Sequence, residues 1–258
     1  MTIIDTHAHL DQLENLDEAL RNAYEAGVEG IVAVSMDVAS CRKNLEIKRA
    51  QNQPKIYLAM GMHPSEAKRE FLEVSLKLIR EHVAELNAIG EIGLDFWYKW
   101  AKKDDKVKEE QREVFRRHLE MAREFNLPVV IHSRGAWQEC FETAKAVGVK
   151  KANFHWYSGP IDVLREILAQ GYFVSTSPSV AHSPQSREAM SFAPIEQTMI
   201  ETDCPVVYRS GPDDPGFRAE PKHVFKTLEA YCALKNIDQK NALEILNRNA
   251  KEFFGIKK

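Results

Sequence analysis

Eight short apolar runs recur along the chain, and charged segments separate them. The runs cover residues 3–4, 30–34, 56–60, 88–93, 129–131, 152–154, 172–174 and 199–200. Between the runs, apolar residues fall at the spacing of a helix face; two examples are the sets Phe71, Val74, Leu78, Ile79, Val83 and Val114, Phe115, Leu119, Ala122, Phe125. Strands that alternate with helices pair in parallel, and eight such units suit a closed barrel. The pattern therefore predicts an α/β fold, the (β/α)8 TIM barrel.

Glycines punctuate this pattern where helices are expected to end. Gly27, Gly148 and Gly171 each stand just ahead of a run, the place where glycine commonly closes a helix. The length of 258 residues suits one barrel, and no Ser/Gly-rich linker divides it, so we expect a single domain over residues 1–258. Residues 96–108 and 206–219 are expected to be insertions on the barrel face that carries function.

Composition limits the class of protein. Hydrophobic residues make up 44% and charged residues 28% of the chain, and no apolar run approaches the roughly 20 residues of a membrane span. The start of the chain lacks the pattern of a secretory signal, so we expect a cytoplasmic monomer or weak homo-oligomer without a membrane partner. The four cysteines are far apart with no Cys-x-x-Cys pair, which is typical of reduced thiols.

The net charge of −3 is not that of a protein that grips duplex nucleic acid over its whole surface. A polyanionic substrate would have to be held locally. The densest basic stretch, residues 99–108, holds five lysines and Trp100, and it directly follows Trp97 and Tyr98. We favour a solvated helix or loop face for this stretch, and the alternative is a surface that binds phosphates and stacks bases.

Six polar residues stand at or just beyond the ends of the apolar runs: His7, His9, Glu91, His132, His155 and Asp203. Singly, each has an ordinary structural role as a hydrogen-bonded core histidine or a capping carboxylate. Together at one barrel rim, four imidazoles and two carboxylates supply ligands for two divalent ions, Zn²⁺, Mn²⁺ or Mg²⁺, with positions left for water. Such a pair of ions activates water for phosphoryl transfer. The set predicts a metal-dependent hydrolase.

Six sequence motifs carry a family resemblance. They are DTHAHL at residues 5–10, GMHP at 61–64, GEIGLD at 90–95, IHSR at 131–134, HWYSG at 155–159 and ETDCP at 201–205, followed by Glu220-Pro221. In this order they resemble the TatD family of metal-dependent deoxyribonucleases, within the amidohydrolase superfamily. The resemblance implies that His7, His9 and Asp203 hold one ion, that Glu91 bridges, and that His132 and His155 hold the second.

The sequence departs from the family pattern in three places, one of them two residues long. Trp156-Tyr157 stands where Cys-Phe is common, Cys204 replaces a frequent Ala, and Ala219 stands where Asn is common. These departures concern the choice of substrate more than the binding of metal.

We assign catalytic roles to Asp203, as the base that accepts a proton from the attacking water, and to Glu91. Arg134 and His63 are candidate substrate-binding residues. Arg134 either grips a phosphate or pairs with a neighbouring carboxylate, and His63 either contacts substrate or caps the turn before Pro64. Asp95 is expected to be a turn residue or to hold a ligand imidazole.

The expected substrate is DNA, as single-stranded or frayed ends. The main alternative is a metal-dependent esterase, lactonase or aminoacyl-tRNA deacylase on the same barrel, because the fold does not decide between phosphoryl and carbonyl chemistry. The resemblance speaks against cyclic amides as substrates, because Glu91 occupies the position at which the superfamily often has a carbamylated lysine. A third hypothesis is a non-catalytic binding protein that its metals stabilise.

Overall fold

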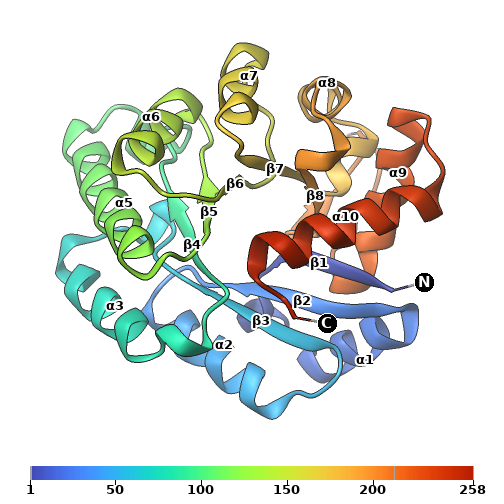
Figure 1. The fold of residues 1–258 in the computed structure, drawn as a ribbon, viewed down its shortest axis with the longest axis horizontal. Coiled ribbons are helices and arrows are strands. Elements are labelled where there is room, and N and C mark those ends of the chain that lie inside the picture. Colours follow the sequence, from blue (N-terminus) through green and yellow to red (C-terminus); the bar gives the residue numbers. More distant parts are fainter. Residues whose placement is uncertain (1, 212, 258) are drawn as a thin grey trace.

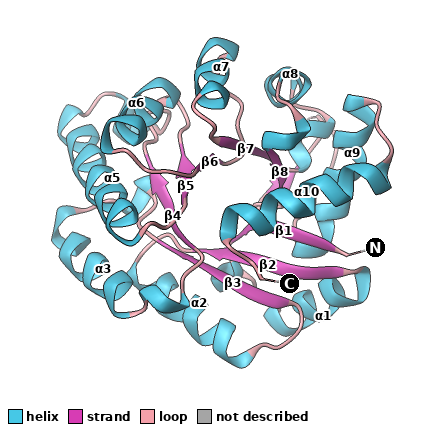
Figure 2. Ribbon diagram, viewed as in Figure 1, coloured by secondary structure: helices cyan, strands magenta, loops and turns pink. Residues whose placement is uncertain are grey.

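The computed structural model describes residues 2–211 and 213–257, and within them eight parallel strands form a nearly closed barrel. The strands follow one another around the barrel in sequence order, with the helices outside (Figure 1, Figure 2). This confirms the predicted (β/α)8 architecture. The strands are β1 (Ile3–Ala8), β2 (Val28–Val34), β3 (Lys55–Met60), β4 (Ala88–Gly93), β5 (Val129–His132), β6 (Ala152–Phe154), β7 (Phe173–Thr176) and β8 (Thr198–Ile200).

The described helices cover the outer face of the barrel and connect the strands. They are α1 (Leu16–Ala26), α2 (Val38–Ala50), α3 (Arg69–Glu81), α4 (Lys99–Lys102), α5 (Asp105–Phe125), α6 (Trp137–Val147), α7 (Ile161–Ala169), α8 (Pro184–Phe192), α9 (Val224–Lys235) and α10 (Gln239–Phe254). Short 3₁₀ turns occupy Leu10–Gln12, Pro64–Glu66, Val83–Glu85, Pro178–Ala181, Ile195–Gln197 and Pro221–His223. Gly27 and Gly148 end α1 and α6 in the left-handed conformation, as the sequence predicted.

The barrel closes where the first strand meets the segment that follows the last one. Ala8, at the end of β1, pairs in parallel with Cys204. The hydroxyl of Thr6 donates a hydrogen bond to the carbonyl of Ile200 at 2.9 Å. The segment after β8 is therefore held against β1 at the rim where the strands end.

The interior of the barrel is apolar at the end where the strands begin. The apolar cluster reaches from α10 to Val34, the last residue of β2, and consists of Ile4, Val32, Val34, Ala59, Ala88, Val130, Met199, Ala250, Phe253 and Phe254. Helix α10 lies across this end (Figure 1): the Asn247 side chain accepts from the Ile4 N–H at 3.1 Å, and the Asn87 side chain donates to the Phe254 carbonyl at 3.1 Å. Apolar side chains and α10 thus cover this end of the barrel.

Helix α3 departs from the predicted helix face. Phe71 and Val74 are 47% and 46% exposed, and Val83 lies beyond α3 in a separate turn. Leu78 and Ile79 are buried as predicted, and Leu72 and Leu76 complete the apolar buried face of α3. The prediction was therefore wrong for Phe71, Val74 and Val83 only, because spacing alone allowed a broader apolar stripe than the barrel contacts.

Both predicted insertions contain regular structure. Residues 96–108 include the short α4 and the start of α5, and residues 206–219 include a two-stranded hairpin of β9 (Val207–Tyr208) and β10 (Phe217–Arg218). Pro212, within the second insertion, lies outside the described residues. All four cysteines are described, buried and free of disulfides. Among the described residues, none of the helices combines the length and apolarity that crossing a bilayer requires.

Candidate metal centre

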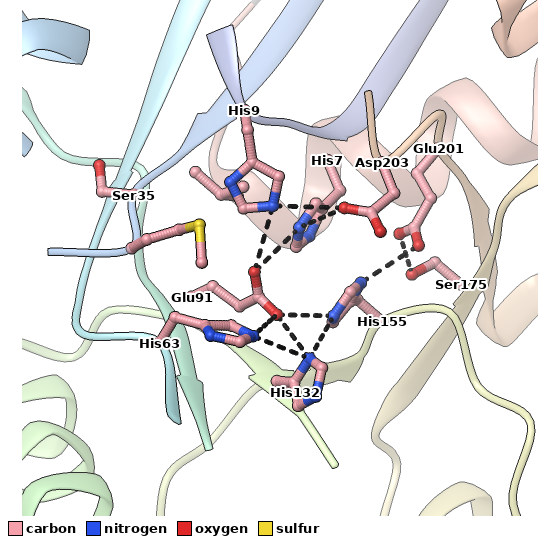
Figure 3. A network of polar contacts seen from close by, with 12 residues as sticks. His7, His9, Ser35, His63, Glu91, His132, His155, Ser175, Glu201 and Asp203 are labelled. Atoms are coloured by element: carbon pink, nitrogen blue, oxygen red, sulfur yellow. Dashed lines mark hydrogen bonds and ion pairs between the residues drawn. The ribbon is translucent and has the colours of Figure 1, made fainter. Parts of the chain in front are cut away.

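The six residues chosen from the strand ends converge at one rim of the barrel (Figure 3). His7 belongs to β1, Glu91 to β4 and His132 to β5. The other three follow a strand directly or within a few residues: His9 after β1, His155 after β6 and Asp203 after β8. Parallel strands bring their carboxyl ends to the same face. The structure therefore brings together the full predicted set.

Glu91 lies at the centre of the cluster, and its two carboxylate oxygens face different histidines. Its Oε2 atom is 3.3 Å from His7 Nε2 and 3.4 Å from His9 Nε2. Its Oε1 atom is 2.8 Å from both His132 Nδ1 and His155 Nε2. One carboxylate thus joins two groups of donor atoms.

Asp203 completes the first group. Its Oδ1 atom is 3.3 Å from His7 Nε2 and 3.3 Å from His9 Nε2. Four donors at Zn²⁺-ligand distances of about 2.0–2.1 Å in a tetrahedron lie about 3.3–3.4 Å apart. The spacing in this group is therefore that of ligands around a small cation.

Buried polar atoms without hydrogen bonds point to the same conclusion. Among the described residues, His7 Nδ1 and Nε2 and His9 Nδ1 are buried and have no hydrogen-bond partner. A buried polar group without a partner is costly. His7 is fully buried, and its Nε2 atom faces the carboxylate oxygens of Glu91 and Asp203. A cation would satisfy this nitrogen, so the donor set suits a divalent metal.

Two further carboxylates fix the orientation of two histidines. Asp95 Oδ2 lies 2.8 Å from His132 Nε2, and Glu201 Oε1 lies 3.3 Å from His155 Nδ1. When the outer nitrogen donates to a carboxylate, the nitrogen that faces Glu91 keeps its lone pair. Asp95 is thus the acceptor that the sequence suggested. In both residues the inward nitrogen is free to coordinate.

The two central carboxylates are held in the charged form. Burial opposes ionisation of Glu91, but His155, His63 and His7 around it hold the pKa of its carboxyl well below its usual range. Burial also opposes ionisation of Asp203, and the neighbouring imidazoles hold its pKa below the usual value. Two buried carboxylates of this kind require positive charge nearby.

The neighbouring carboxylates raise the pKa of two of the imidazoles, those of His155 and His132. Burial favours neutral His155, but the charges of Glu91 and Glu201 outweigh it and raise the pKa well above its usual range. His132 is buried too, and its contacts with Asp95 and Glu91 raise its pKa. Protons or divalent cations can supply the positive charge, and binding of a metal displaces the protons.

The backbone around the centre is specialised. Asp203 adopts the left-handed conformation at φ 48°, and its N–H donates to the His7 carbonyl at 2.9 Å. Gly93, at φ +148°, lies so close to β5 that an added Cβ would meet the His132 carbonyl oxygen at 1.9 Å. Only glycine allows β4 and β5 to approach this closely. The local chain is therefore shaped to present Asp203 and His132.

The two candidate substrate-binding residues both reach the cluster. His63 caps the following turn, since its Nδ1 accepts from the Ser65 N–H at 3.1 Å, but its Nε2 points inward to 3.5 Å from Glu91 Oε1. Burial lowers the pKa of His63 to about 3. Arg134 Nε donates to Asp95 Oδ2 at 2.8 Å, and the Arg134 side chain remains 45% exposed. The pairing of Arg134 with a carboxylate is therefore observed, and the side chain still faces the groove.

A cavity of about 1100 Å³ opens above the cluster. Aromatic rings and arginines line much of it: Trp97, Tyr98, Trp137, Trp156, Tyr208, Arg134, Arg209 and Arg218. Trp97 is 63% exposed, with Lys102 Nζ 5.5 Å from the centre of its ring. The aromatic start of the 96–108 segment therefore borders the cavity, whereas the lysines that follow continue into α4 and α5.

Sequence reasoning assigned no role to Glu201, Ser175 or Asp5. Ser175 donates to Glu201 Oε2 at 2.5 Å (Figure 3). Asp5 accepts hydrogen bonds from the N–H and the hydroxyl of Thr202, and burial raises its pKa to about 8. Glu201 directly follows the run that forms β8. The strand-end criterion that selected Asp203 therefore could have found Glu201 as well.

Comparison with known proteins supports a single family. The family model described as TatD related DNase matches residues 4–255. The Bacillus subtilis metal-dependent hydrolase YabD is 32% identical over 263 residues, which cover 98% of this chain and 99% of YabD. Human deoxyribonuclease TATDN3 is 31% identical over 264 residues, which cover 98% of this chain and 94% of TATDN3.

A solved structure supports the fold. YjjV, a TatD homologue from Escherichia coli K12, has a TM-score of 0.87 with this chain at 22% identity, and the match covers 99% of this chain and 98% of that one. The resemblance found in the motifs is confirmed over the whole length of the chain. The chain belongs to the TatD family of metal-dependent hydrolases.

Proposed function

We propose that this chain is a two-metal deoxyribonuclease that hydrolyses phosphodiester bonds at flexible or single-stranded DNA ends. The observation that carries the proposal is the position of Glu91, whose two oxygens face separate groups of imidazoles. A bridging carboxylate between two ions is the arrangement that serves both the attacking and the leaving oxygen of a phosphoryl transfer.

In this proposal the ligands divide at Glu91. His7, His9 and Asp203 would hold one ion, and His132 and His155 would hold the other. The identity of the ions, Zn²⁺, Mn²⁺ or Mg²⁺, belongs to the proposal. Bound divalent ions would lower the pKa of water and neutralise charge on the phosphoryl oxygens.

The chain's own groups do the remaining work. The Asp203 carboxylate, which borders the first group of donors, accepts the proton of the attacking water. The proton then passes to the departing sugar oxygen. Arg134 reaches into the cavity and grips a phosphate oxygen, and His63 Nε2 contacts the substrate beside Glu91.

The substrate follows from the cavity and from the charge of the chain. A net charge of −3 gives little general attraction to a rigid duplex. Exposed rings such as Trp97 can stack the bases of one strand, and the arginines on the cavity wall can hold its phosphates. We therefore propose that one strand enters by its end. A cytoplasmic location and a monomeric or weakly homo-oligomeric state are part of the same proposal.

A panel of labelled substrates with added Mg²⁺, Mn²⁺ or Zn²⁺ tests the function. It contains single-stranded DNA, blunt duplex DNA, RNA, aminoacyl-tRNA and model lactones. We expect fastest cleavage of single-stranded or frayed DNA ends. Faster cleavage inside blunt duplex would overturn the substrate proposal, and turnover of only the carboxylic esters would establish the esterase alternative.

A further inference from the structure

Asp95 makes more contacts than the support of one histidine requires. The residue directly follows Leu94 beyond β4, and it is fully buried. Its Oδ2 atom accepts two hydrogen bonds, from His132 Nε2 at 2.8 Å and from Arg134 Nε at 2.8 Å. Its Oδ1 atom accepts two more, from the backbone N–H groups of Trp97 at 2.9 Å and Tyr98 at 3.2 Å.

These four donors belong to different parts of the centre. His132 faces Glu91 with its other nitrogen, Nδ1, at 2.8 Å. Arg134 lines the cavity and lies over the ring of Tyr98, 4.7 Å from its centre. Trp97 and Tyr98 begin the aromatic segment of the cavity wall. One buried carboxylate thus touches the metal centre, the cavity arginine and the aromatic wall.

The backbone of Asp95 is held by a side chain of helix α5. Its N–H donates to Gln111 Oε1 at 3.0 Å, and Gln111 Nε2 donates to the Pro64 carbonyl at 3.2 Å. Gln111 is buried in α5. Since the backbone of Asp95 is anchored to this helix, its carboxylate can serve as a fixed reference for His132 and Arg134.

Glu201 provides an internal comparison. It also holds one histidine of the same half of the centre, through His155 Nδ1 at 3.3 Å. Its second oxygen accepts from Ser175 Oγ at 2.5 Å (Figure 3). Among the described contacts, Glu201 is bonded to no arginine of the cavity wall. Both carboxylates therefore orient a histidine of the centre, and of these two only Asp95 also binds an arginine of the cavity wall.

We propose that Asp95 is a positioning residue that couples the second metal position, at His132, to phosphate binding by Arg134. The proposal rests on the function proposed above. An asparagine in its place keeps the shape but offers a single acceptor oxygen and no charge. The variant cannot satisfy His132, Arg134 and the two backbone N–H groups in the same geometry. Metal retention and substrate affinity should therefore weaken together.

Metal titration is the first arm of the test. Mn²⁺ and Zn²⁺ are titrated by calorimetry into metal-free parent, Asp95→Asn and Glu201→Gln proteins. Both variants should bind one of the two ions, the one at His132 and His155, about 10–100-fold less tightly, the usual effect of losing a carboxylate behind a ligand histidine. The affinity for the other ion should be unaffected in both. Thermal unfolding of each protein checks that it is folded.

Substrate affinity is the second arm, and it separates the two carboxylates. With saturating metal, Asp95→Asn should raise the KM for a single-stranded oligonucleotide about tenfold, as Arg134→Ala should, since a charge-assisted hydrogen bond is lost in each. Glu201→Gln should leave the KM within about twofold. The KM of the double variant Asp95→Asn/Arg134→Ala should equal that of Arg134→Ala alone.

The outcomes separate the alternatives. If Asp95→Asn keeps parental metal affinity and parental KM, the proposal is wrong. A second outcome is that Asp95→Asn weakens metal binding, but the KM of the double variant exceeds that of Arg134→Ala by the full effect of Asp95→Asn. Asp95 then supports His132 without acting through Arg134, and the coupling is refuted. If Asp95→Asn does not fold, Asp95→Glu replaces it, and its metal affinity and KM are again expected to change together.

Failure of the proposed function is distinguishable from failure of this inference. If the parent protein cleaves no oligonucleotide, the nuclease proposal falls. The metal titration still reports on His132, and calorimetric binding of inorganic phosphate to the metal-loaded protein replaces the KM. Equal phosphate affinity in the parent and Asp95→Asn would then refute the coupling.

Discussion

The two ends of the barrel interior differ in the side chains that occupy them: one end is packed with apolar residues, and the other presents polar residues to a cavity. Where the strands begin, apolar side chains fill the space and α10 covers it, with Phe253 and Phe254 only 2% exposed. Where the strands end, four imidazoles and two carboxylates converge on a cavity of about 1100 Å³. The same eight strands therefore contribute packing residues at the end where they begin and candidate metal ligands at the end where they finish.

The difference also appears in how polar atoms are satisfied. In the helix layer, the buried residue His118 contacts Ser75 Oγ through Nε2 and the Val114 carbonyl through Nδ1. At the rim, His7 is just as buried, and neither of its nitrogens has a hydrogen bond within the described part of the chain. A histidine that serves the fold is satisfied by protein atoms, whereas His7 is left available for a cation.

The largest expected effect is at the rim. Asp203→Asn keeps the shape and one oxygen but removes the charge and most of the basicity. Metal should remain with Glu91, His132 and His155, and kcat should fall by roughly 10²–10⁴, the range for loss of a general base. The KM should change much less. If turnover at saturating metal stays within a few-fold of the parent, Asp203 is not the base and Glu91 becomes the candidate.

A substitution at the opposite end should affect stability alone. Phe253 packs edge-to-face on Phe173 and Phe254, so Phe253→Ala should lower the free energy of unfolding by about 3–5 kcal/mol. Denaturant unfolding measures the change, and metal content per folded molecule should stay parental. Phe71→Ala, on an exposed ring of α3, is the control and should change stability by less than about 0.5 kcal/mol. Loss of metal in folded Phe253→Ala protein would contradict the claim that the two ends of the barrel act independently.

A smaller effect should come from His118 in acid. Burial lowers its pKa to about 4, below the ordinary 6.5, so the native state excludes a proton that the unfolded chain accepts. The stability from neutral His118 is complete above pH 6.5 and is lost as the pH falls toward 4, by up to about 3 kcal/mol. Unfolding of metal-free parent and His118→Gln proteins between pH 7 and 4 isolates this contribution. Parallel pH profiles for the two proteins would contradict the assignment.

The sequence predicted the barrel and the six central residues because both follow from one rule. Runs that end together in a parallel barrel place the next polar residues at one rim, and His7, Glu91 and His132 obey it directly. Asp203 lies three residues beyond β8, has a left-handed backbone and still reaches the centre. The metal-dependent hydrolase class followed from this residue set and from the motifs.

Other features depended on side-chain geometry that spacing does not encode. The two contacts on one oxygen of Asp95 require specific rotamers of His132 and Arg134. The inward direction of His63 Nε2 depends on the cap that Nδ1 makes with Ser65. The exposure of Phe71 depends on how far the barrel surface extends beneath α3. These features arise from packing between segments that are distant in sequence.

The claim that the rim is a two-metal centre has one direct test, the location of metal in crystals of protein reconstituted with Mn²⁺ or Zn²⁺. Anomalous scattering should give one peak among His7, His9, Asp203 and Glu91 Oε2 and a second beside Glu91 Oε1, His132 and His155, with up to two ions per chain by elemental analysis. Reconstituted protein that carries no divalent metal and gives no peak at either position would contradict the account.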